Sequence, residues 1–442
     1  MQEIHTDVLI IGAGMAGATA AARSLEHGNT VVVVERAPTI GGSALYAGYA
    51  WTAPNHAVMD EVNPNGDLAL RRELVDGFPA AIAWVRSLGV ECGAAMTVLR
   101  YGIGHQFDTN QYVDECRRRI SAQGRLFTET NTLALRTLDS AVVGAMLRLA
   151  DGSECEIRAT ATILATGGFQ ADPELVAAKI HPAAGEMPLR SNPTSSGDGL
   201  RLAESVGAAT SRPHSGFYGH LVPTEITFRD PGDFVALSLY YSEHALLFDV
   251  NNRRFTDETL GDHLTAMQLL QQPGARGLLV ADDRVYREWI RASYVEGAVA
   301  IDKFDLTQRR AGRCGVAETL DDFTYLPQEW GYDGPAIAEQ IRRVNNAGAA
   351  VQPPRTHDST PLDQGPYYVI EARPALTFPF HGIRIDAHGR VLATNGRAIE
   401  GLFAAGSDIG GLYDHAYAGG IAPALVFGLA AADTASLPRT SV

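Results

Sequence analysis

The sequence predicts an α/β protein of two domains, the first of which is built on a parallel sheet. A short apolar run at residues 8–11 is bounded by glycine, as a buried parallel strand is. A glycine-rich turn and an alanine-rich stretch then lead into a second apolar run at 31–34, which gives the order strand, helix, strand. With 442 residues, the chain also exceeds the usual size of a single hydrophobic core.

The turn after the first strand has the glycine spacing of a Rossmann-like dinucleotide-binding unit. Gly12 permits a tight turn, Gly14 lets the backbone approach a pyrophosphate, and Gly17 lets the helix pack closely on the strand. Glu35 stands at the end of the second strand, where an acidic residue accepts a hydrogen bond from a ribose hydroxyl. The alternative is a glycine-rich turn without a ligand. A turn without a ligand does not require a strand, glycines, a helix, a second strand and an acidic residue in this order. The observed order therefore favours the dinucleotide-binding interpretation.

A glycine doublet and a stretch of small residues follow Glu35. Gly41, Gly42 and Ser43 lead into residues 44–50, whose small side chains let the backbone lie against a flat cofactor. In many flavoproteins a glycine doublet follows the acidic strand end in this way. The pattern therefore favours FAD over NAD.

The domain boundaries follow from the texture of the remaining chain. Residues 128–165 alternate as strands do, with a hairpin signal at Asp151 and Gly152, and the last of these strands ends at ATGG. Another strand ends at residues 402–408, and a final helix is predicted at 422–432 after a glycine pair. Both ends of the chain thus contribute to one nucleotide site. We predict an FAD-binding domain at 1–213 and 361–442, with an inserted α+β capping domain at 214–360, which is richer in aromatic and charged residues.

Composition excludes several classes of partner. The formal net charge of −15 repels phosphate backbones and anionic lipid, so we expect neither nucleic acid nor a membrane surface as a partner. No run of about 18 apolar residues could span a bilayer. The four cysteines are far apart and lack CxxC spacing, which predicts reduced thiols and no metal cluster. The N-terminus shows no signal-peptide pattern, and we expect a cytoplasmic protein.

Six motifs in order resemble the fumarate reductase/succinate dehydrogenase flavoprotein family, which also contains the 3-ketosteroid dehydrogenases. They are GAGMAG with Glu35, GGS at 41–43, ATGG at 165–168, SGDG at 196–199, RFTDE at 254–258 and AAGSD ending at Asp408. The resemblance covers nearly the whole chain.

The resemblance implies an FAD domain capped by a catalytic domain, with the substrate between the cap and the flavin. Hydride would move between flavin N5 and a carbon next to an activated one. Covalent members carry a histidine near the glycine doublet, and residues 41–49 contain none, so we expect non-covalent FAD. The residues expected at FAD are Gly12, Gly14, Ala16, Gly17, Glu35, Arg36, Gly41, Gly42, Ser43, Ala47, Gly48, Ala165, Thr166, Gly167, Asp198, Gly406, Ser407, Asp408, Gly420 and Ala422.

The chain departs from the dicarboxylate enzymes near its last glycine pair. Those enzymes hold a substrate carboxylate with an arginine in a pattern like RLGG, whereas this chain has YAGG with Tyr417. The tyrosine matches that of the YPGxG pattern of ketosteroid dehydrogenases, with Ala418 in place of the proline. Arginine grips a carboxylate with two hydrogen bonds, and tyrosine donates one, which suits a ketone oxygen. The substitution favours a ketone or enone substrate.

Four residues are candidates for the chemistry. Tyr417 would hold the ketone oxygen, and Tyr218 or His220 would exchange the proton on the carbon beside it. Tyr101 would line the pocket with His105. The alternatives are a packed core tyrosine for Tyr417 and an aromatic domain hinge for Tyr218 and His220.

Three other positions have weaker grounds for a catalytic role. Glu258 matches the proton-relay glutamate of the fumarate reductases, but Gly261 stands where the arginine of that relay is expected. Arg284 and Arg287 are candidate acids, although most arginines on such a helix are solvated.

We expect an FAD-dependent oxidoreductase that acts on the CH–CH or C=C pair next to a ketone. The alternatives are a reductase or dehydrogenase of a polycarboxylate that uses other basic groups, and a flavin-binding protein without turnover. The sequence does not identify the electron acceptor or donor.

Overall fold

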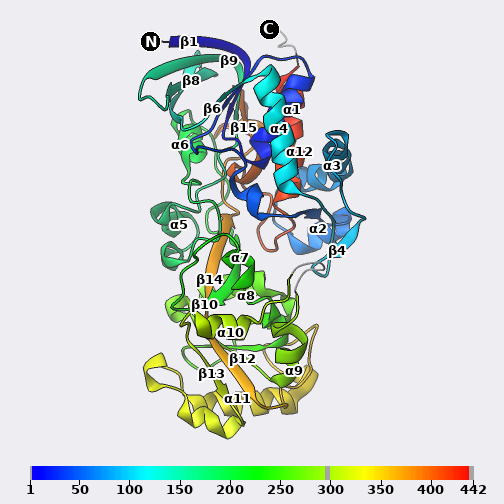
Figure 1. Ribbon diagram of the computed structural model, residues 1–442, viewed down its shortest axis with the longest axis vertical. Coiled ribbons are helices and arrows are strands. Elements are labelled where there is room, and N and C mark those ends of the chain that lie inside the picture. The colour runs from blue at the N-terminus through cyan, green and yellow to red at the C-terminus, as the bar shows by residue number, and fades with distance from the viewer. Residues whose placement is uncertain (1, 294–298, 438–442) are drawn as a thin grey trace. The chain divides into compact units, whose positions relative to one another are not determined.

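The computed structural model describes residues 2–293 and 299–437 (Figure 1). The chain divides into two compact units. Unit 1 comprises Met1–Ile180, Ser191–Gly216 and Phe378–Val442. Unit 2 comprises His181–Arg190 and Phe217–Thr377.

The bounds of unit 2 differ from the predicted inserted domain, 214–360, mainly at two places. Residues 361–377 belong to unit 2 because β14 (Tyr367–Pro379) pairs with β12 (Gly277–Ala281). Residues 181–190 belong to it because Leu189 bridges to Leu376 of the same strand. Both pairings join segments that are distant in sequence, so no local pattern marks them.

Unit 1 is organised around an eight-stranded sheet with a parallel centre. β1 pairs in parallel with β2 and β9, β2 with β6, and β16 with β9, which confirms the predicted strand–helix–strand unit and the α/β class. β15 and the hairpin β7–β8 are antiparallel. The strands are β1 (Gln2–Ile11), β2 (Val31–Val34), β6 (Arg125–Phe127), β7 (Asn131–Leu138), β8 (Ala141–Arg148), β9 (Glu154–Leu164), β15 (Arg390–Leu392) and β16 (Ala398–Ala404). A second, antiparallel sheet joins β3 (Tyr49–Thr52), β4 (Met96–Val98) and β5 (Gly102–Gln106).

Helices from both ends of the chain pack together in unit 1. α1 contacts α4 and α12, and the three lie side by side in Figure 1. A Cβ at Gly428 would lie 2.9 Å from the Ala16 carbonyl oxygen, so a glycine is what lets α12 approach α1. The buried Tyr112 hydroxyl bonds with the hydroxyl of Thr19 at 2.8 Å and accepts from the Trp84 indole at 3.1 Å. The helices are α1 (Met15–Glu26), α2 (His56–Val62), α3 (Leu68–Ser87), α4 (Thr109–Gln123), α5 (Pro173–Lys179), α6 (Asp198–Ser205) and α12 (Ile421–Ala435).

Unit 2 contains a five-stranded sheet with a hydrophobic core on each face. Successive residues of β11 (Leu246–Asp249) enter different cores. Leu247 packs with α8 (Asp262–Leu270) and α10 (Lys303–Arg309), whereas Leu246 and Phe248 pack with α11 (Gly334–Ala347). This arrangement is the predicted α+β architecture. The remaining strands are β10 (Phe217–Pro223), β11 (Leu246–Asp249) and β13 (Cys314–Ala317), and the helices are α7 (Asp233–Ala236), α8 (Asp262–Leu270), α9 (Asp283–Val285), α10 (Lys303–Arg309) and α11 (Gly334–Ala347).

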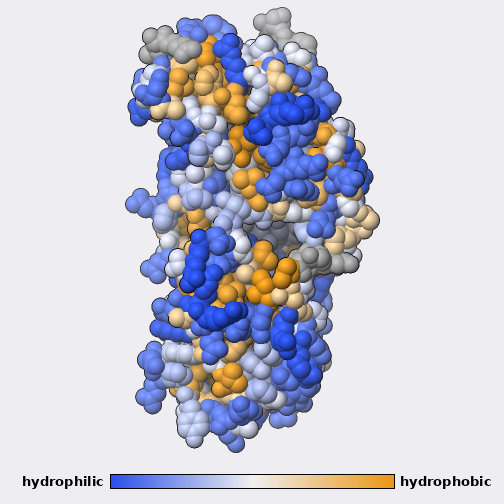
Figure 2. Space-filling model, viewed as in Figure 1, coloured by the Kyte–Doolittle hydropathy of each residue, from blue (hydrophilic) through white to orange (hydrophobic). Residues whose placement is uncertain are grey.

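The surface and the cysteines agree with the composition. Hydrophilic residues cover most of the face shown in Figure 2, and apolar residues lie in separate groups among them. Within residues 2–293 and 299–437, no helix is both long enough and apolar enough to cross a bilayer. All four cysteines are free thiols; Cys116 and Cys155 are buried, whereas Cys92 and Cys314 are partly exposed.

Candidate active site

The glycine turn after β1 is fixed by close backbone contacts. Gly12 has a φ of +99°, and a Cβ there would lie 2.2 Å from the Ala165 carbonyl oxygen. A Cβ at Gly17 would lie 1.9 Å from the Gly12 carbonyl oxygen. The fold itself therefore requires glycine at positions 12 and 17, where strand, turn and helix meet.

Gly14 differs, because packing does not require a glycine there. Its φ is −72°, and a Cβ would approach only the Gly41 carbonyl oxygen, at an ordinary contact distance of 3.8 Å. Gly14 precedes α1, whose N-terminus has no side-chain cap and no acidic residue in its first turn. The space that a side chain at position 14 would fill, next to the N–H groups of a helix start, fits a pyrophosphate.

The acidic end of β2 contacts the glycine turn directly. Glu35 is 8% exposed, and its carboxylate accepts from the N–H groups of Ala13 and Ala37, both at 2.8 Å. Each carboxylate oxygen keeps a second lone pair that could accept from a ribose hydroxyl. Arg36 donates to Asp198 at 2.8 Å, which joins the SGDG segment to the end of β2.

Two more predicted cofactor segments meet at a buried carboxylate. Asp408 accepts from the Gly168 N–H and the Thr166 hydroxyl, both at 2.9 Å, and from the Thr166 N–H. Gly199 N–H donates to the Thr166 hydroxyl at 3.0 Å. Burial raises the pKa of Asp408, although these hydrogen bonds oppose the shift. Asp408 therefore ties the ATGG turn to the C-terminal part of the sheet, and its contact with FAD stays a prediction.

The glycine doublet and the small residues after it border the same turn. Gly41 N–H donates to the Ala13 carbonyl at 2.8 Å. The Ser43 hydroxyl bonds with that of Ser191 at 2.9 Å, and a Cβ at Gly48 would have no atom within 4 Å. The other predicted cofactor residues belong to unit 1 as well: Ala16, Gly42, Ala47, Gly167, Gly406, Ser407, Gly420 and Ala422.

Tyr417 lies in an aromatic cluster before α12. Its ring contacts Trp51, Phe378 and Tyr413, with centroid distances of 5.1, 5.7 and 6.3 Å. A Cβ at Gly420 would lie 3.4 Å from the Tyr417 hydroxyl, which places that oxygen at the residue preceding the helix. The hydroxyl therefore stands where a helix N-terminus adds partial positive charge.

Tyr101 belongs to this cluster, whereas His105 bonds elsewhere. The Tyr101 hydroxyl donates to the Tyr417 carbonyl oxygen at 2.6 Å, and its ring centroid is 6.1 Å from that of Trp51. Burial raises the pKa of Tyr101 above its ordinary range. His105 Nδ1 instead bonds with the Gly93 carbonyl at 2.8 Å. Tyr101 thus positions the Tyr417 backbone and keeps its own proton.

Tyr218 and His220 form a hydrogen-bonded chain with Asp262 in unit 2. His220 Nε2 lies 2.7 Å from the Tyr218 hydroxyl, and His220 Nδ1 lies 2.7 Å from an Asp262 oxygen. β10 presents the first two side chains, and Asp262 begins α8. The three residues, called the relay below, have the order phenol, imidazole, carboxylate, which can move a proton.

Comparison with known proteins assigns the chain to a family. A family described as "FAD binding domain" matches residues 100–421, and one described as "FAD dependent oxidoreductase" matches residues 7–168. The chain belongs to this FAD-binding family. It is an FAD-dependent oxidoreductase of the fumarate reductase group, as the motifs predicted.

Relatives and solved structures agree with this assignment. A fumarate reductase (cytochrome) of Shewanella frigidimarina is 27% identical over 97% of this chain and 77% of its own length. A vinyl phenol reductase of Lactiplantibacillus plantarum is 24% identical over 93% of this chain and 91% of its own. The fold also matches the crystal structure of 3-ketosteroid-Δ4-(5α)-dehydrogenase from Rhodococcus jostii RHA1 in complex with 4-androstene-3,17-dione. That match has a TM-score of 0.78, covers 99% of this chain and 98% of the other, and has 17% identity.

The geometry of unit 1 fits the FAD of this flavoprotein family. The turn at Gly14 leaves room for the pyrophosphate, and Glu35 has acceptor capacity for a ribose hydroxyl. The segments at 41–48, 165–168 and 404–408 approach the turn as glycine-rich backbone. FAD would therefore be held by both ends of this flavoprotein chain.

Burial and two cations determine the charge state of the relay. Burial lowers the pKa of His220, and Arg190 and Lys303 lower it further, whereas Asp262 opposes them. Burial raises the pKa of Asp262, but His220 and its hydrogen bond outweigh burial, so that pKa lies below its ordinary value. We therefore assign Asp262 as the anion and His220 as the neutral imidazole. The Nδ1–H of His220 then donates to the Asp262 carboxylate, and His220 Nε2 accepts from the Tyr218 hydroxyl.

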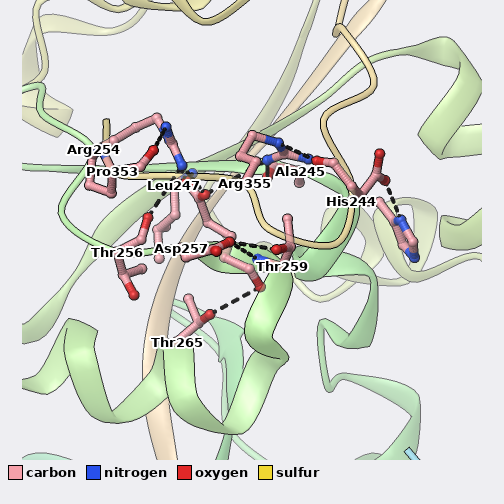
Figure 3. Close-up of polar contacts among 12 residues, drawn as sticks. His244, Ala245, Leu247, Arg254, Thr256, Asp257, Thr259, Thr265, Pro353 and Arg355 are labelled. Atoms are coloured by element: carbon pink, nitrogen blue, oxygen red, sulfur yellow. Dashed lines mark hydrogen bonds and ion pairs between the residues drawn. The ribbon is translucent and has the colours of Figure 1, made fainter. Parts of the chain in front are cut away.

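Glu258 is fully buried in an ionic cluster of unit 2 with Arg254 and Arg355, and Figure 3 shows the two arginines. Glu258 accepts from Arg254 Nε at 2.9 Å and from the Leu247 N–H at 3.0 Å, and Arg355 approaches to 3.7 Å. Arg355 also donates to the Ala245 carbonyl at 2.7 Å. Two cations and a backbone donor thus satisfy this glutamate, which gives it a structural role in holding the 353–358 segment.

Of the two candidate arginines, Arg287 is exposed and bonds with Asp283 at 2.8 Å, whereas Arg284 is largely buried. Its Nη1 makes one weak bond, at 3.4 Å, to Glu288. Nε and Nη2 are buried and have no acceptor within the part of the chain that the structure describes. The planar guanidinium, with two unused donors, could donate two hydrogen bonds to a carboxylate.

The sequence interpretation missed Asp262, Arg190, Lys303 and Tyr240. Asp262 opens a helix, and an acidic residue there is typical of helix starts in general. Arg190, Tyr240 and Lys303 come from three separate segments around His220. Only the folded chain brings them together.

Proposed function

We propose that this flavoprotein transfers hydride between FAD and the CH–CH or C=C pair beside a ketone carbonyl. The observation that carries the proposal is the Tyr417 hydroxyl at the start of α12, within a cluster of aromatic rings. A single phenol donor next to a helix N-terminus suits the oxygen of a ketone, on which negative charge develops during reaction.

FAD, when bound, accepts or supplies the hydride at the carbon one removed from the carbonyl group. The side chains handle the proton and the charge. Tyr417 donates a hydrogen bond to the ketone oxygen, which acidifies the C–H beside the carbonyl. In the oxidative direction, Tyr218 takes that proton while its own proton passes to His220 Nε2. Asp262 stabilises the imidazolium that forms. In the reductive direction the same groups return the proton to carbon.

An anaerobic titration tests the proposal. The oxidised protein is mixed with a saturated cyclic ketone, and the dithionite-reduced protein with the corresponding enone, while the flavin absorbance is recorded. We expect bleaching in the first case or reoxidation in the second. No change with any ketone or enone pair would contradict the ketone proposal. If unsaturated acids also leave the flavin unchanged, the protein binds flavin without redox turnover.

The buried donors of Arg284, and relatives that are a fumarate reductase and a urocanate reductase, favour a second candidate substrate, an unsaturated acid. In this case Arg284 would hold the carboxylate, and the reaction at the C=C bond would be the same. Arg284→Met should then raise KM for the acid by at least about tenfold, because a charged hydrogen bond contributes roughly 1.5–3 kcal/mol. The matched control is Arg287→Met, which removes an arginine three residues away that is 58% exposed. Equal effects of the two substitutions would exclude this candidate.

The cytoplasmic location and the electron partner stay predictions. Fractionation of the native cells locates the protein. Assay of the reduced flavin with NADH, quinones and small cytochromes identifies the carrier that exchanges electrons with it.

A further inference from the structure

Two buried cations lie close to the relay and are not used in the chemistry proposed above. Lys303 is 5% exposed, and its ammonium group donates to the carbonyls of Val235 at 2.9 Å and Ala236 at 3.2 Å. Arg190 is 9% exposed, and its Nε donates to the Phe234 carbonyl at 2.7 Å. In the described part of the chain, neither cation forms an ion pair with a carboxylate. Within the described residues, both charges are therefore held by neutral acceptors and not by a carboxylate in direct contact.

Tyr240 connects both cations to the imidazole. Arg190 Nη2 donates to the Tyr240 hydroxyl at 3.0 Å, and the Lys303 ammonium lies 5.1 Å from the centre of the Tyr240 ring. The edge of this ring meets His220, with 4.9 Å between centroids and an interplanar angle of 83°. One tyrosine thus contacts both positive charges and the imidazole of the relay.

The choice of lysine at position 303 is itself informative. Among 36 lysine and arginine residues the chain has only two lysines, Lys179 and Lys303. Arginine stays charged wherever it is buried, whereas the pKa of a buried lysine moves readily. Burial and Arg190 lower the pKa of Lys303 to about 8, against the pull of Asp262. The cation next to the relay is therefore one whose charge can respond to its surroundings.

We propose that Lys303 and Arg190 are positioning residues that keep the imidazole of the relay neutral at rest, so that His220 Nε2 is free to take the Tyr218 proton. The inference rests on the proton-transfer role proposed above for Tyr218. A neutral imidazole is needed because a protonated one would have no lone pair for the phenol.

The charged and polar groups around His220 come from five segments. Asp262 on α8 favours the imidazolium, and Lys303 on α10 and Arg190 disfavour it. Tyr218 on β10 and Tyr240 are neutral neighbours. Removing the Lys303 charge leaves Asp262 opposed by one cation instead of two. The imidazolium then becomes easier to form, and the His220 pKa should rise.

Histidine-selective ¹³C and ¹⁵N NMR of the flavin-loaded full chain measures this directly. The His220 signal is assigned by its absence from His220→Gln. We expect Lys303→Met to raise the titration midpoint of His220 by up to about one pH unit. Lys303→Arg keeps the charge and should leave the midpoint near the wild-type value. Lys179→Met, the same substitution at the other lysine, should not move it.

Three outcomes overturn the inference: an unchanged His220 midpoint in Lys303→Met, an equal shift in Lys179→Met, or an equal shift in Lys303→Arg. If Lys303→Met does not fold, Lys303→Gln carries the same prediction, because its amide can donate to the Val235 and Ala236 carbonyls. Thermal melting and flavin content of each variant check the fold.

Turnover separates this inference from the function on which it rests. With an active ketone, the pH at which oxidation reaches half its maximal rate should rise in Lys303→Met by the same amount as the His220 midpoint. A shift in the NMR midpoint without turnover of any ketone or enone would support the charge effect on His220 and contradict the proposed function. Turnover of a ketone or enone with an unchanged His220 midpoint would support the proposed function and contradict the charge effect on His220.

Discussion

At the scale of single residues, the proposed ketone chemistry depends most on the hydroxyl of Tyr417. If it donates to the ketone oxygen as charge develops, Tyr417→Phe removes an interaction made mainly in the transition state. Turnover should fall by about 10²–10³. FAD content should not change, because the ring contacts with Trp51 and Phe378 do not need the hydroxyl. Turnover and flavin occupancy are measured on one preparation. Full occupancy with turnover within a few-fold of wild type would contradict the catalytic role and show that Tyr417 only packs in the core.

The glycines of the first turn allow a second comparison, between Gly12→Ala and Gly14→Ala. The first puts a Cβ 2.2 Å from the Ala165 carbonyl oxygen at a φ of +99° and should cost roughly 3 kcal/mol or more of folding stability. The second fills only the space assigned to the pyrophosphate. It should change the stability of the flavin-free protein by less than about 1 kcal/mol and yet weaken FAD binding. Urea unfolding and FAD titration of both variants test this. Unimpaired FAD binding by a folded Gly14→Ala protein would show that the pyrophosphate lies elsewhere.

These residues also show how far the site could be predicted from the sequence. Gly12, Gly14 and Glu35 belong to one local unit whose spacing is itself the signal. Tyr218 and His220 are two residues apart on a strand, so their side chains share a face and were predicted together. Asp262 could not be paired with them from sequence, because the contact depends on how α8 packs on β10.

At the scale of elements, a titratable ion pair joins the 3₁₀-helix at Tyr240–His244 to the 353–360 segment. His244 Nδ1 lies 2.7 Å from an Asp358 carboxylate oxygen. Figure 3 shows His244 near Arg355, a member of the ionic cluster around Glu258. Burial lowers the pKa of His244, but its hydrogen bond with Asp358 and the nearby Glu243 carboxylate outweigh burial and raise that pKa. Because the pKa of His244 is raised in the folded state, the pair contributes its full stabilisation of unit 2 at pH values below the unfolded histidine pKa of about 6.5. That stability is lost as the pH rises through the folded pKa.

Comparison of wild type with His244→Gln measures this contribution. The free energy of unfolding of wild type should fall more between about pH 6 and pH 9 than that of His244→Gln. The other histidines are common to both proteins and cancel in the difference. Parallel pH curves for the two proteins would mean that the pair contributes no pH-dependent stability.

Elements with a local pattern were predicted, and elements that depend on distant pairing were not. The hairpin signal at Asp151 and Gly152 corresponds to the turn between β8 and β9, and the predicted helix at 422–432 corresponds to α12. The small sheet of β3, β4 and β5 and the long strand β14 carried no such signal. β14 pairs with β12 and β13, and its register is set by those partners.

At the scale of the whole molecule, we expect FAD to connect segments that the chain order separates. Gly12, Gly14 and Glu35 come from the first strand–helix–strand unit, and the predicted FAD residues Asp408 and Gly420 come from the C-terminal part of the chain. A ligand that binds only when these segments are assembled stabilises the folded state by mass action. At one hundred times its Kd, such a ligand adds about 2.7 kcal/mol.

The last prediction follows from this assembly. The purified protein should be yellow, and acid precipitation should release FAD, because unfolding separates the segments that hold it and residues 41–49 offer no histidine for a covalent bond. The released flavin should be FAD and not FMN, because Glu35 and the Gly14 turn provide for an adenosine ribose and a pyrophosphate. Chromatography of the supernatant identifies the flavin, and the colour of the pellet reports any covalent fraction. Removing FAD with concentrated bromide should lower the melting temperature, and adding FAD back should restore it. FMN in the supernatant, flavin retained in the pellet, or a melting temperature that does not respond to FAD would each contradict the site described for unit 1.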